Sequence, residues 1–151
     1  MSNFTQGVKF VNVTPPAARV NNASATTNSI DTTGYSYATV LVELGVTDIA
    51  LTALKLQESD TDSSYADITG AVFGTSADPT GATTTLPSAS DGNKIFAFYV
   101  DLKGRRKYLK PVITVGNGTA GAFVACQCIL SGADVQSHTA AGLNVGQYIA
   151  I

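Results

Sequence analysis

Two apolar runs separated by a basic turn, within residues 94–116, constrain the fold more than any other part of the chain. The runs at 95–102 and 108–115 are rich in β-branched and aromatic residues, which favour strands. Between them, residues 103–107 read Lys-Gly-Arg-Arg-Lys and supply the glycine that tight turns favour. The sequence therefore predicts a β-hairpin with a basic tip.

The first of these runs is apolar on both faces of the expected strand. Successive side chains alternate across a strand. One set is Phe96, Phe98 and Val100, and the other is Ile95, Ala97 and Tyr99. A strand of this kind lies inside a sandwich or against a neighbouring subunit. In the second run, Pro111 cannot donate to a sheet ladder, so this strand is expected to be fully paired on one side only, or to be bulged there.

Low charge is the second constraint. The 151 residues fit one globular domain, and only 13% of them are charged, where about 25% is usual. A polar surface with few charges gives little electrostatic repulsion between molecules and so favours association. The composition therefore suggests a protein whose outside is largely covered in an assembly, with an ordinary soluble β domain as the alternative.

The charge balance argues against nucleic acid and membrane partners. Nine basic residues stand against eleven acidic ones, whereas nucleic-acid-binding domains are strongly basic. The cations of the turn, Lys103, Arg105, Arg106 and Lys107, are more simply explained as a solvated tip or a salt-bridge site. No apolar run approaches the roughly 20 residues that span a bilayer. The first nine residues lack the pattern of a signal peptide, so we expect synthesis in the cytoplasm.

Further strands are expected along the chain, and together they predict an all-β sandwich with long loops. The alternating or apolar segments are residues 7–13, 37–45, 49–58, 65–69 and 122–130. In the second of them Ala38, Val40, Val42 and Leu44 share one face. A polar turn joins 49–58 and 65–69 into an expected hairpin, and the near-continuous apolar content of 122–130 predicts a central strand. Residues 49–58 also fit a helix, but their short length and the neighbouring strands favour β. Residues 17–28 read as a loop or a short edge strand. Residues 74–93 are expected to form a loop. Loops of this length are uncommon in compact domains and are usually functional, so this one is expected to pass over a partner, for example.

Candidate chemistry is sparse. Cys126 and Cys128 lie two apart, so in a strand they share a face at about 6.6 Å, too far for a disulfide, and we expect two reduced core thiols. The turn containing Asp60 and Asp62 lacks the glycine and the closing glutamate of a calcium loop. With one His, no nucleophile motif and no phosphate loop, the sequence predicts no enzyme, no metal and no cofactor.

The chain is expected to divide into a β-sandwich domain, residues 1–132, and a C-terminal arm, residues 133–151. The arm is loosely patterned but ends apolar, with Leu143, Val145, Tyr148, Ile149 and Ile151. Chain ends are usually disordered unless they are tied down, so an apolar end indicates docking on the body or on a neighbouring subunit.

Two stretches resemble small virion proteins of tailed bacteriophages. Residues 54–71 combine an alternating strand, Gln-Glu-Ser-Asp, an aromatic residue and Asp-Ile, and residues 101–115 contain Gly-Arg-Arg-Lys-Tyr-Leu. With the composition, the likeness is to capsid decoration (cement) proteins. This resemblance implies a β-sandwich of jelly-roll type that sits as a homotrimer on the outer capsid surface of the virion. There it would tie neighbouring major capsid proteins together.

For the partner-binding residues we select Tyr99, Arg105, Arg106 and Tyr108, since aromatic and arginine side chains dominate interfaces. Two other functions stay open. One is a tail or head-to-tail joining component of the same particle. The other is a carbohydrate-binding sandwich with an aromatic platform drawn from Tyr35, Tyr37 or Tyr65, which the absence of Trp disfavours.

Overall fold

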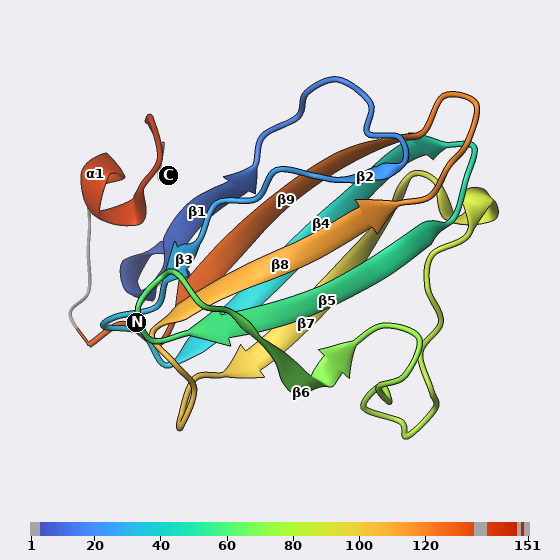
Figure 1. Cartoon of the computed structure of the whole chain (residues 1–151). Helices are drawn as coiled ribbons and strands as arrows, with labels where there is room; N and C mark the ends of the chain where they lie inside the picture. Colours follow the sequence, from blue (N-terminus) through green and yellow to red (C-terminus); the bar gives the residue numbers. More distant parts are fainter. Residues whose placement is uncertain (1–3, 135–138, 148, 150–151) are drawn as a thin grey trace.

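Two antiparallel β-sheets packed face to face form the protein (Figure 1). The computed structural model describes residues 4–134, 139–147 and 149. The four-stranded sheet has the order β1-β9-β4-β7. Its strands are β1 (Lys9–Thr14), β4 (Tyr37–Thr47), β7 (Lys94–Asp101) and β9 (Ala122–Ser131).

The second sheet has five strands in the order β2-β8-β5-β6, with β3 pairing beside β2 on the same edge of β8. Its strands are β2 (Ala23–Ser24), β3 (Ile30–Asp31), β5 (Leu51–Ser59), β6 (Ala66–Val72) and β8 (Tyr108–Val115). The described helices are short: η1 (Phe4–Gly7), η2 (Ala89–Asp91) and α1 (Ala140–Leu143).

The core lies between the sheets and follows the alternation of the strands. In β4 the buried side chains are Ala38, Val40, Val42 and Leu44, as the sequence predicts. Across the core, Leu54 and Leu56 of β5 and Ile113 of β8 are almost fully buried. The all-β sandwich is therefore confirmed, because one apolar face of each sheet is covered by the other sheet.

The predicted hairpin of residues 94–116 is wrong. β7 pairs with β4 in the four-stranded sheet, and β8 pairs with β5 in the other sheet. The connection between them crosses from one sheet to the other, which lie about 10 Å apart. Phe98 and Leu109 thus belong to the two opposing layers of one core. Side chains alternate with a period of two residues both in a hairpin and in two strands joined by an arch. The alternation in the sequence therefore cannot distinguish the two connections.

β7 is also not enclosed in the sandwich, since it forms the edge of its sheet. Its inner residues Phe98 and Val100 are buried, while Ile95 and Tyr99 on its outer face are 63% and 70% exposed. A strand that is apolar on both faces is expected to be covered on both. This chain covers only the inner face of β7. The outer face of β7 is left open.

Several other sequence predictions are confirmed. Residues 49–58 are strand, and β5 and β6 form the expected hairpin. β9 is a central strand between β1 and β4. Pro111 lies opposite Leu56 of β5, and on its other side β2 and β3 pair only with the two ends of β8. The second run is therefore paired along its length on one side only, as expected, with a register shift between Leu51 and Ala53 of β5 at its end.

The described part of the C-terminal segment lies against β1, at the edge of the four-stranded sheet (Figure 1). Leu143 of α1 is only 1% exposed, and Asn144 Nδ2 donates to the Phe10 carbonyl at 2.8 Å. Tyr148 and Ile151 lie outside the described residues. These contacts cover part of the β1 edge.

The loop between β8 and β9 approaches the backbone of the segment after β1 too closely for a side chain. Val20 and Ala122 exchange two backbone hydrogen bonds, both of 2.8 Å. Gly121, which precedes Ala122, has φ +85°, and a Cβ there would lie 2.1 Å from the Val20 carbonyl oxygen. Only glycine permits this contact, which joins β9 to the crossing segment.

We therefore expect Gly121→Ala to lower the free energy of unfolding by about 3 kcal/mol, from left-handed strain plus steric overlap. Gly70→Ala is the matched control, because Gly70 has φ +90° but no described atom within 4 Å of a Cβ. It should lose only about 1 kcal/mol, from the backbone term alone. Urea denaturation of both variants measures the difference. Equal losses would show that the close contact at Gly121 is not a constraint.

Candidate functional site

The outer face of the four-stranded sheet is the strongest candidate for an interaction surface. Because β4 buries its even-numbered side chains, it turns Tyr37, Thr39, Leu41 and Glu43 outward. β7 turns Ile95, Ala97 and Tyr99 outward in the same way. The register pairs Thr39 with Tyr99, Leu41 with Ala97 and Glu43 with Ile95.

An exposed pair of tyrosines lies at the end of this face. The Tyr37 and Tyr99 rings are stacked, with centroids 5.8 Å apart and an interplanar angle of 17°. Tyr37 is 39% exposed and Tyr99 is 70% exposed. Stacked tyrosines present a flat apolar surface with hydroxyl groups at its rim, a combination that is enriched at interfaces.

The apolar character continues onto β9 and β1. Ile129 of β9 lies opposite Thr39, and Phe10 of β1 lies opposite Ile129. Gln127 and Ala125 of β9 lie opposite Leu41 and Glu43. We call this set the outer face: Phe10, Tyr37, Thr39, Leu41, Glu43, Ile95, Ala97, Tyr99, Asp101, Ala125, Gln127 and Ile129. Glu43 and Asp101, which lies opposite Tyr37, are its two charged residues.

The opposite outside of the sandwich is different. On the five-stranded sheet, Lys55 Nζ lies 2.8 Å from Asp67 Oδ2, and Gln57 Nε2 donates to Asp67 Oδ1 at 2.7 Å. These contacts lower the pKa of Asp67, with the Lys55 hydrogen bond as the largest cause. Nearby, Lys110 Nζ lies 5.4 Å from the centre of the Tyr65 ring. This side has the paired charges of an ordinary solvated surface, so the two outsides are suited to different surroundings.

The four predicted partner-binding residues do not share one surface. Tyr99 lies on the outer face, in the four-stranded sheet. Arg105 and Arg106 lie in the arch between the sheets, and Tyr108 begins β8 in the five-stranded sheet. Only Tyr99 of the four thus belongs to the candidate surface.

The basic arch is partly neutralised by the turn that follows β5. Arg105 Nη1 lies 3.7 Å from Glu58 Oε1, and Arg106 Nε lies 3.7 Å from Asp60 Oδ2. The Arg106 backbone N–H also donates to Glu58 Oε2 at 3.2 Å. Lys107 lies over the Tyr108 ring at 5.0 Å, and hydrogen bonding to Tyr108 raises the pKa of Lys107. The arginines therefore hold the arch to the neighbouring turn.

The tyrosines of the carbohydrate hypothesis lie apart. Tyr37 stacks on Tyr99, while Tyr35 packs partly buried against the core. Tyr65 lies beyond the β5–β6 turn, and its hydroxyl donates to Asp62 Oδ1. Burial and this carboxylate raise the pKa of Tyr65 to about 12. The three rings do not make a common platform.

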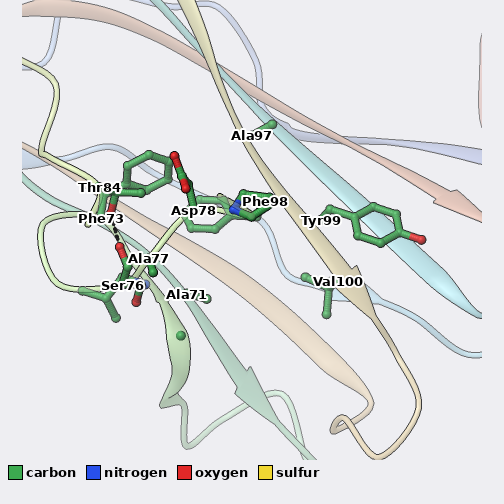
Figure 2. A pocket seen from close by; sticks show the side chains of 13 residues that line it. Ala71, Phe73, Ser76, Ala77, Asp78, Thr84, Ala97, Phe98, Tyr99 and Val100 are labelled. Carbon is green, nitrogen blue, oxygen red and sulfur yellow. Dashed lines mark hydrogen bonds between the residues drawn. The ribbon is translucent and has the colours of Figure 1, made fainter. Parts of the chain in front are cut away.

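A hollow of about 530 Å³ opens between β6 and β7 (Figure 2). Its floor contains Phe98, and Phe73 contacts Phe98 edge-on with ring centroids 5.2 Å apart. Asp78 at its rim already accepts hydrogen bonds from Thr80 N, Thr80 Oγ1 and Ala82 N. The lining is thus mainly apolar, and its one carboxylate is held at Oδ1 by the turn that follows it.

The acidic turn after β5 is engaged in protein contacts. Asp62 accepts from Tyr65, which lowers the Asp62 pKa, and Asp60 faces Arg106. Within the described part of the chain, no three His, Cys, Asp or Glu side chains are grouped as a metal site would need. Nor does any described helix have the length and apolar character needed to cross a bilayer.

Comparisons of the chain with protein-family models, with curated proteins and with solved structures found no match.

Sequence reasoning missed part of the outer face. Tyr37 and Leu41 of β4, and Ile129 of β9, join Tyr99 only through the strand order and register. The available signal was the apolar second face of β7, shown by Ile95 and Tyr99. That signal indicates a covered surface but does not say which strands extend it.

The two thiols are buried in β9, on its core side, and both are free. Burial raises the pKa of Cys126 and of Cys128 to about 12. A thiol with a raised folded-state pKa ionises first in the unfolded chain. The thiols therefore reduce stability as pH rises from about 9 towards 12.

We expect native protein at pH 8 to be unreactive towards Ellman's reagent, and both thiols to react after unfolding in urea. We also expect a lower urea midpoint at pH 10 than at pH 8. A Cys126→Ala/Cys128→Ala double variant, which lacks these titrations, should lose less stability over the same interval. Rapid labelling of the native protein would contradict the buried positions.

Proposed function

We propose that the protein is a structural, non-enzymatic virion component that binds the outside of an assembled tailed-bacteriophage capsid. The observation that carries this proposal is the contrast between the two outsides of the sandwich. The outer face carries two charged residues, Glu43 and Asp101, among exposed apolar side chains, whereas the opposite outside carries paired charges such as Lys55 and Asp67. An exposed apolar patch of this kind marks an association surface.

Cementing a shell requires binding and no chemistry. A protein that binds the assembled shell and not its free subunits stabilises the shell by mass action. The outer face supports this role with a stacked and exposed tyrosine pair, Tyr37 and Tyr99, as aromatic anchors. A few large aromatic side chains usually contribute most of the binding free energy of a contact.

We further propose that the sandwich is of jelly-roll type. The antiparallel pairs β1–β9, β2–β8, β4–β7 and β5–β6 support this, because they nest within one another along the chain, the first strand with the last. Two sheets that alternate in this way correspond to the double Greek key common in viral capsid and lectin domains.

The identity of the partner comes from the resemblance of residues 54–71 and 101–115 to decoration proteins. In this proposal the partner is the major capsid protein, and the protein acts on the capsid surface of the virion. The same resemblance supports a homotrimer.

The test is to add purified protein to phage shells stripped of it and to measure binding and the temperature of shell rupture. Wild-type protein should bind and raise that temperature. Tyr99→Ala should weaken binding about 30-fold, which corresponds to about 2 kcal/mol for an aromatic anchor. Tyr65→Ala, in the turn before β6 and away from the outer face, is the matched control and should bind as wild type does.

The proposal is wrong if the wild-type protein ignores the shells, or if Tyr99→Ala binds them unchanged. Electron microscopy of labelled protein on whole particles supplies the location. Label spread over the capsid supports decoration, whereas label confined to the tail or the neck would instead support the joining role.

A further inference from the structure

A second hollow, of about 420 Å³, opens on the outer face beside the C-terminal segment, and we call it the outer-face hollow. Strands β1, β4 and β9 supply most of its lining, and residues 144–146, which follow α1, close it on the β1 side. Its lining includes apolar side chains, Phe10, Leu41 and Ala125, and polar ones, Asn12, Glu43, Gln127 and Asn144. It thus combines apolar walls with a few hydrogen-bonding groups, as binding sites usually do.

Glu43 is the only charged side chain in the described lining of the outer-face hollow. The ion pairs found in the described part of the chain use other carboxylates, those of Glu58, Asp60, Asp67 and Asp91. Across the sheet, Glu43 lies opposite Ile95 on one side and Ala125 on the other, and both are apolar. Among the described residues, no cation is therefore paired with the Glu43 carboxylate.

Covering the outer face changes the surroundings of this carboxylate. While the face is open, Glu43 is exposed and solvent can hydrate it. Removing a carboxylate from water is strongly unfavourable unless a cation and N–H donors replace the water. A partner that covers the face must therefore supply the cation. This step rests on the proposed function, in which a subunit of the capsid shell covers the outer face.

The other carboxylate of the outer face does not impose the same demand. Asp101 is the last residue of β7, and its Oδ1 accepts the Lys103 backbone N–H at 3.0 Å. At the end of an edge strand it can stay in solvent, as charges at the rim of an interface do. Glu43 lies on β4, which has a strand on either side.

The groups around Glu43 suit a guanidinium better than an ammonium group. Asn144 Nδ2 donates to the Phe10 carbonyl at 2.8 Å, which leaves its Oδ1 as an acceptor. Asn12 and Gln127 lie opposite each other on β1 and β9, both are exposed, and each provides an amide oxygen. A guanidinium has five N–H donors in one plane and can pair with a carboxylate through two of them, whereas an ammonium has three. The apolar walls suit the aliphatic stem of an arginine side chain.

We propose that an arginine side chain of the capsid shell protein enters the outer-face hollow and pairs with Glu43. Tyr37 and Glu43 are six residues apart on β4, so the tyrosine pair and this ion pair are roughly 20 Å apart. One anchor is aromatic and the other is ionic, so they cannot exchange places on the partner. The outer-face hollow thus fixes the orientation of the protein on the shell.

The test is binding to stripped phage shells over a range of salt concentrations. Glu43→Gln nearly keeps the shape of the side chain but removes its charge, so it should weaken binding about tenfold or more and flatten the salt dependence. Glu43→Lys brings two cations together and should weaken binding further. Asp60→Asn is the matched control. It removes the same charge from the exposed turn after β5, away from the outer face, and should bind as wild type does.

Chemical modification of the shells tests the identity of the cation. Phenylglyoxal modifies arginine and should lower the affinity of the shells for wild-type protein to that for Glu43→Gln. It should change the affinity for Glu43→Gln much less, because the pair is already absent. Acetylation of shell lysines should leave the difference between the two proteins intact, and a difference that disappears would assign the cation to lysine and overturn the proposal.

Other results would also overturn it. If Glu43→Gln binds as tightly as wild type while Tyr99→Ala binds weakly, the proposed function stands without the arginine. Equal losses in Glu43→Gln and Asp60→Asn would indicate an effect of net charge and not a specific pair. A change in the mass of the isolated protein on Glu43→Gln, measured by light scattering, would assign the cation to a second copy. Wild-type protein that ignores the shells would instead contradict the proposed function itself, and this pairing with it.

Discussion

The fold depends on burying one apolar face of each sheet against the other, and strand alternation decides which residues take part. In β4 and β9 every second side chain enters the core, including Val40 and Cys128. Burial of this kind contributes roughly 25 cal/mol per Å² of apolar area. Once the inner faces are filled, the remaining apolar side chains must face outward. β7 has a full second set of apolar side chains, and these can be covered only by another chain.

The charges hold the ends of the sandwich, and the outer face carries only two of them, Glu43 and Asp101. Glu58 lies near the end of β5 and Asp60 in the turn after it, whereas Arg105 and Arg106 belong to the arch between β7 and β8. These contacts tie the arch, which crosses between sheets, to the turn of the neighbouring hairpin. At the other end, Asp48 accepts the N–H groups of Ala120 and Gly121, which lower its pKa.

Much of the fold could be predicted from the period-two pattern. Tyr37–Thr47 and the β5–β6 hairpin follow from alternation and from a polar turn, which are local signals. The partner of β7 could not be predicted, because the same alternation fits a hairpin with β8 and an arch to the other sheet. Strand order depends on contacts between residues far apart in the sequence, such as those of Val40 with Phe98. The full extent of the candidate surface could not be predicted for the same reason. Ile95 and Tyr99 could be assigned to one face, but Tyr37 and Ile129 join them only through register.

The central claim is that the outer set of β7 side chains is covered by another chain when the protein acts. Hydroxyl-radical footprinting of the isolated chain at low concentration and of its assembled form measures this directly. The account predicts that Ile95 and Tyr99 are oxidised readily in the isolated chain and become protected on assembly, while Phe98 is protected in both. The account is contradicted if Ile95 and Tyr99 are oxidised as readily in every assembled form as in the isolated chain.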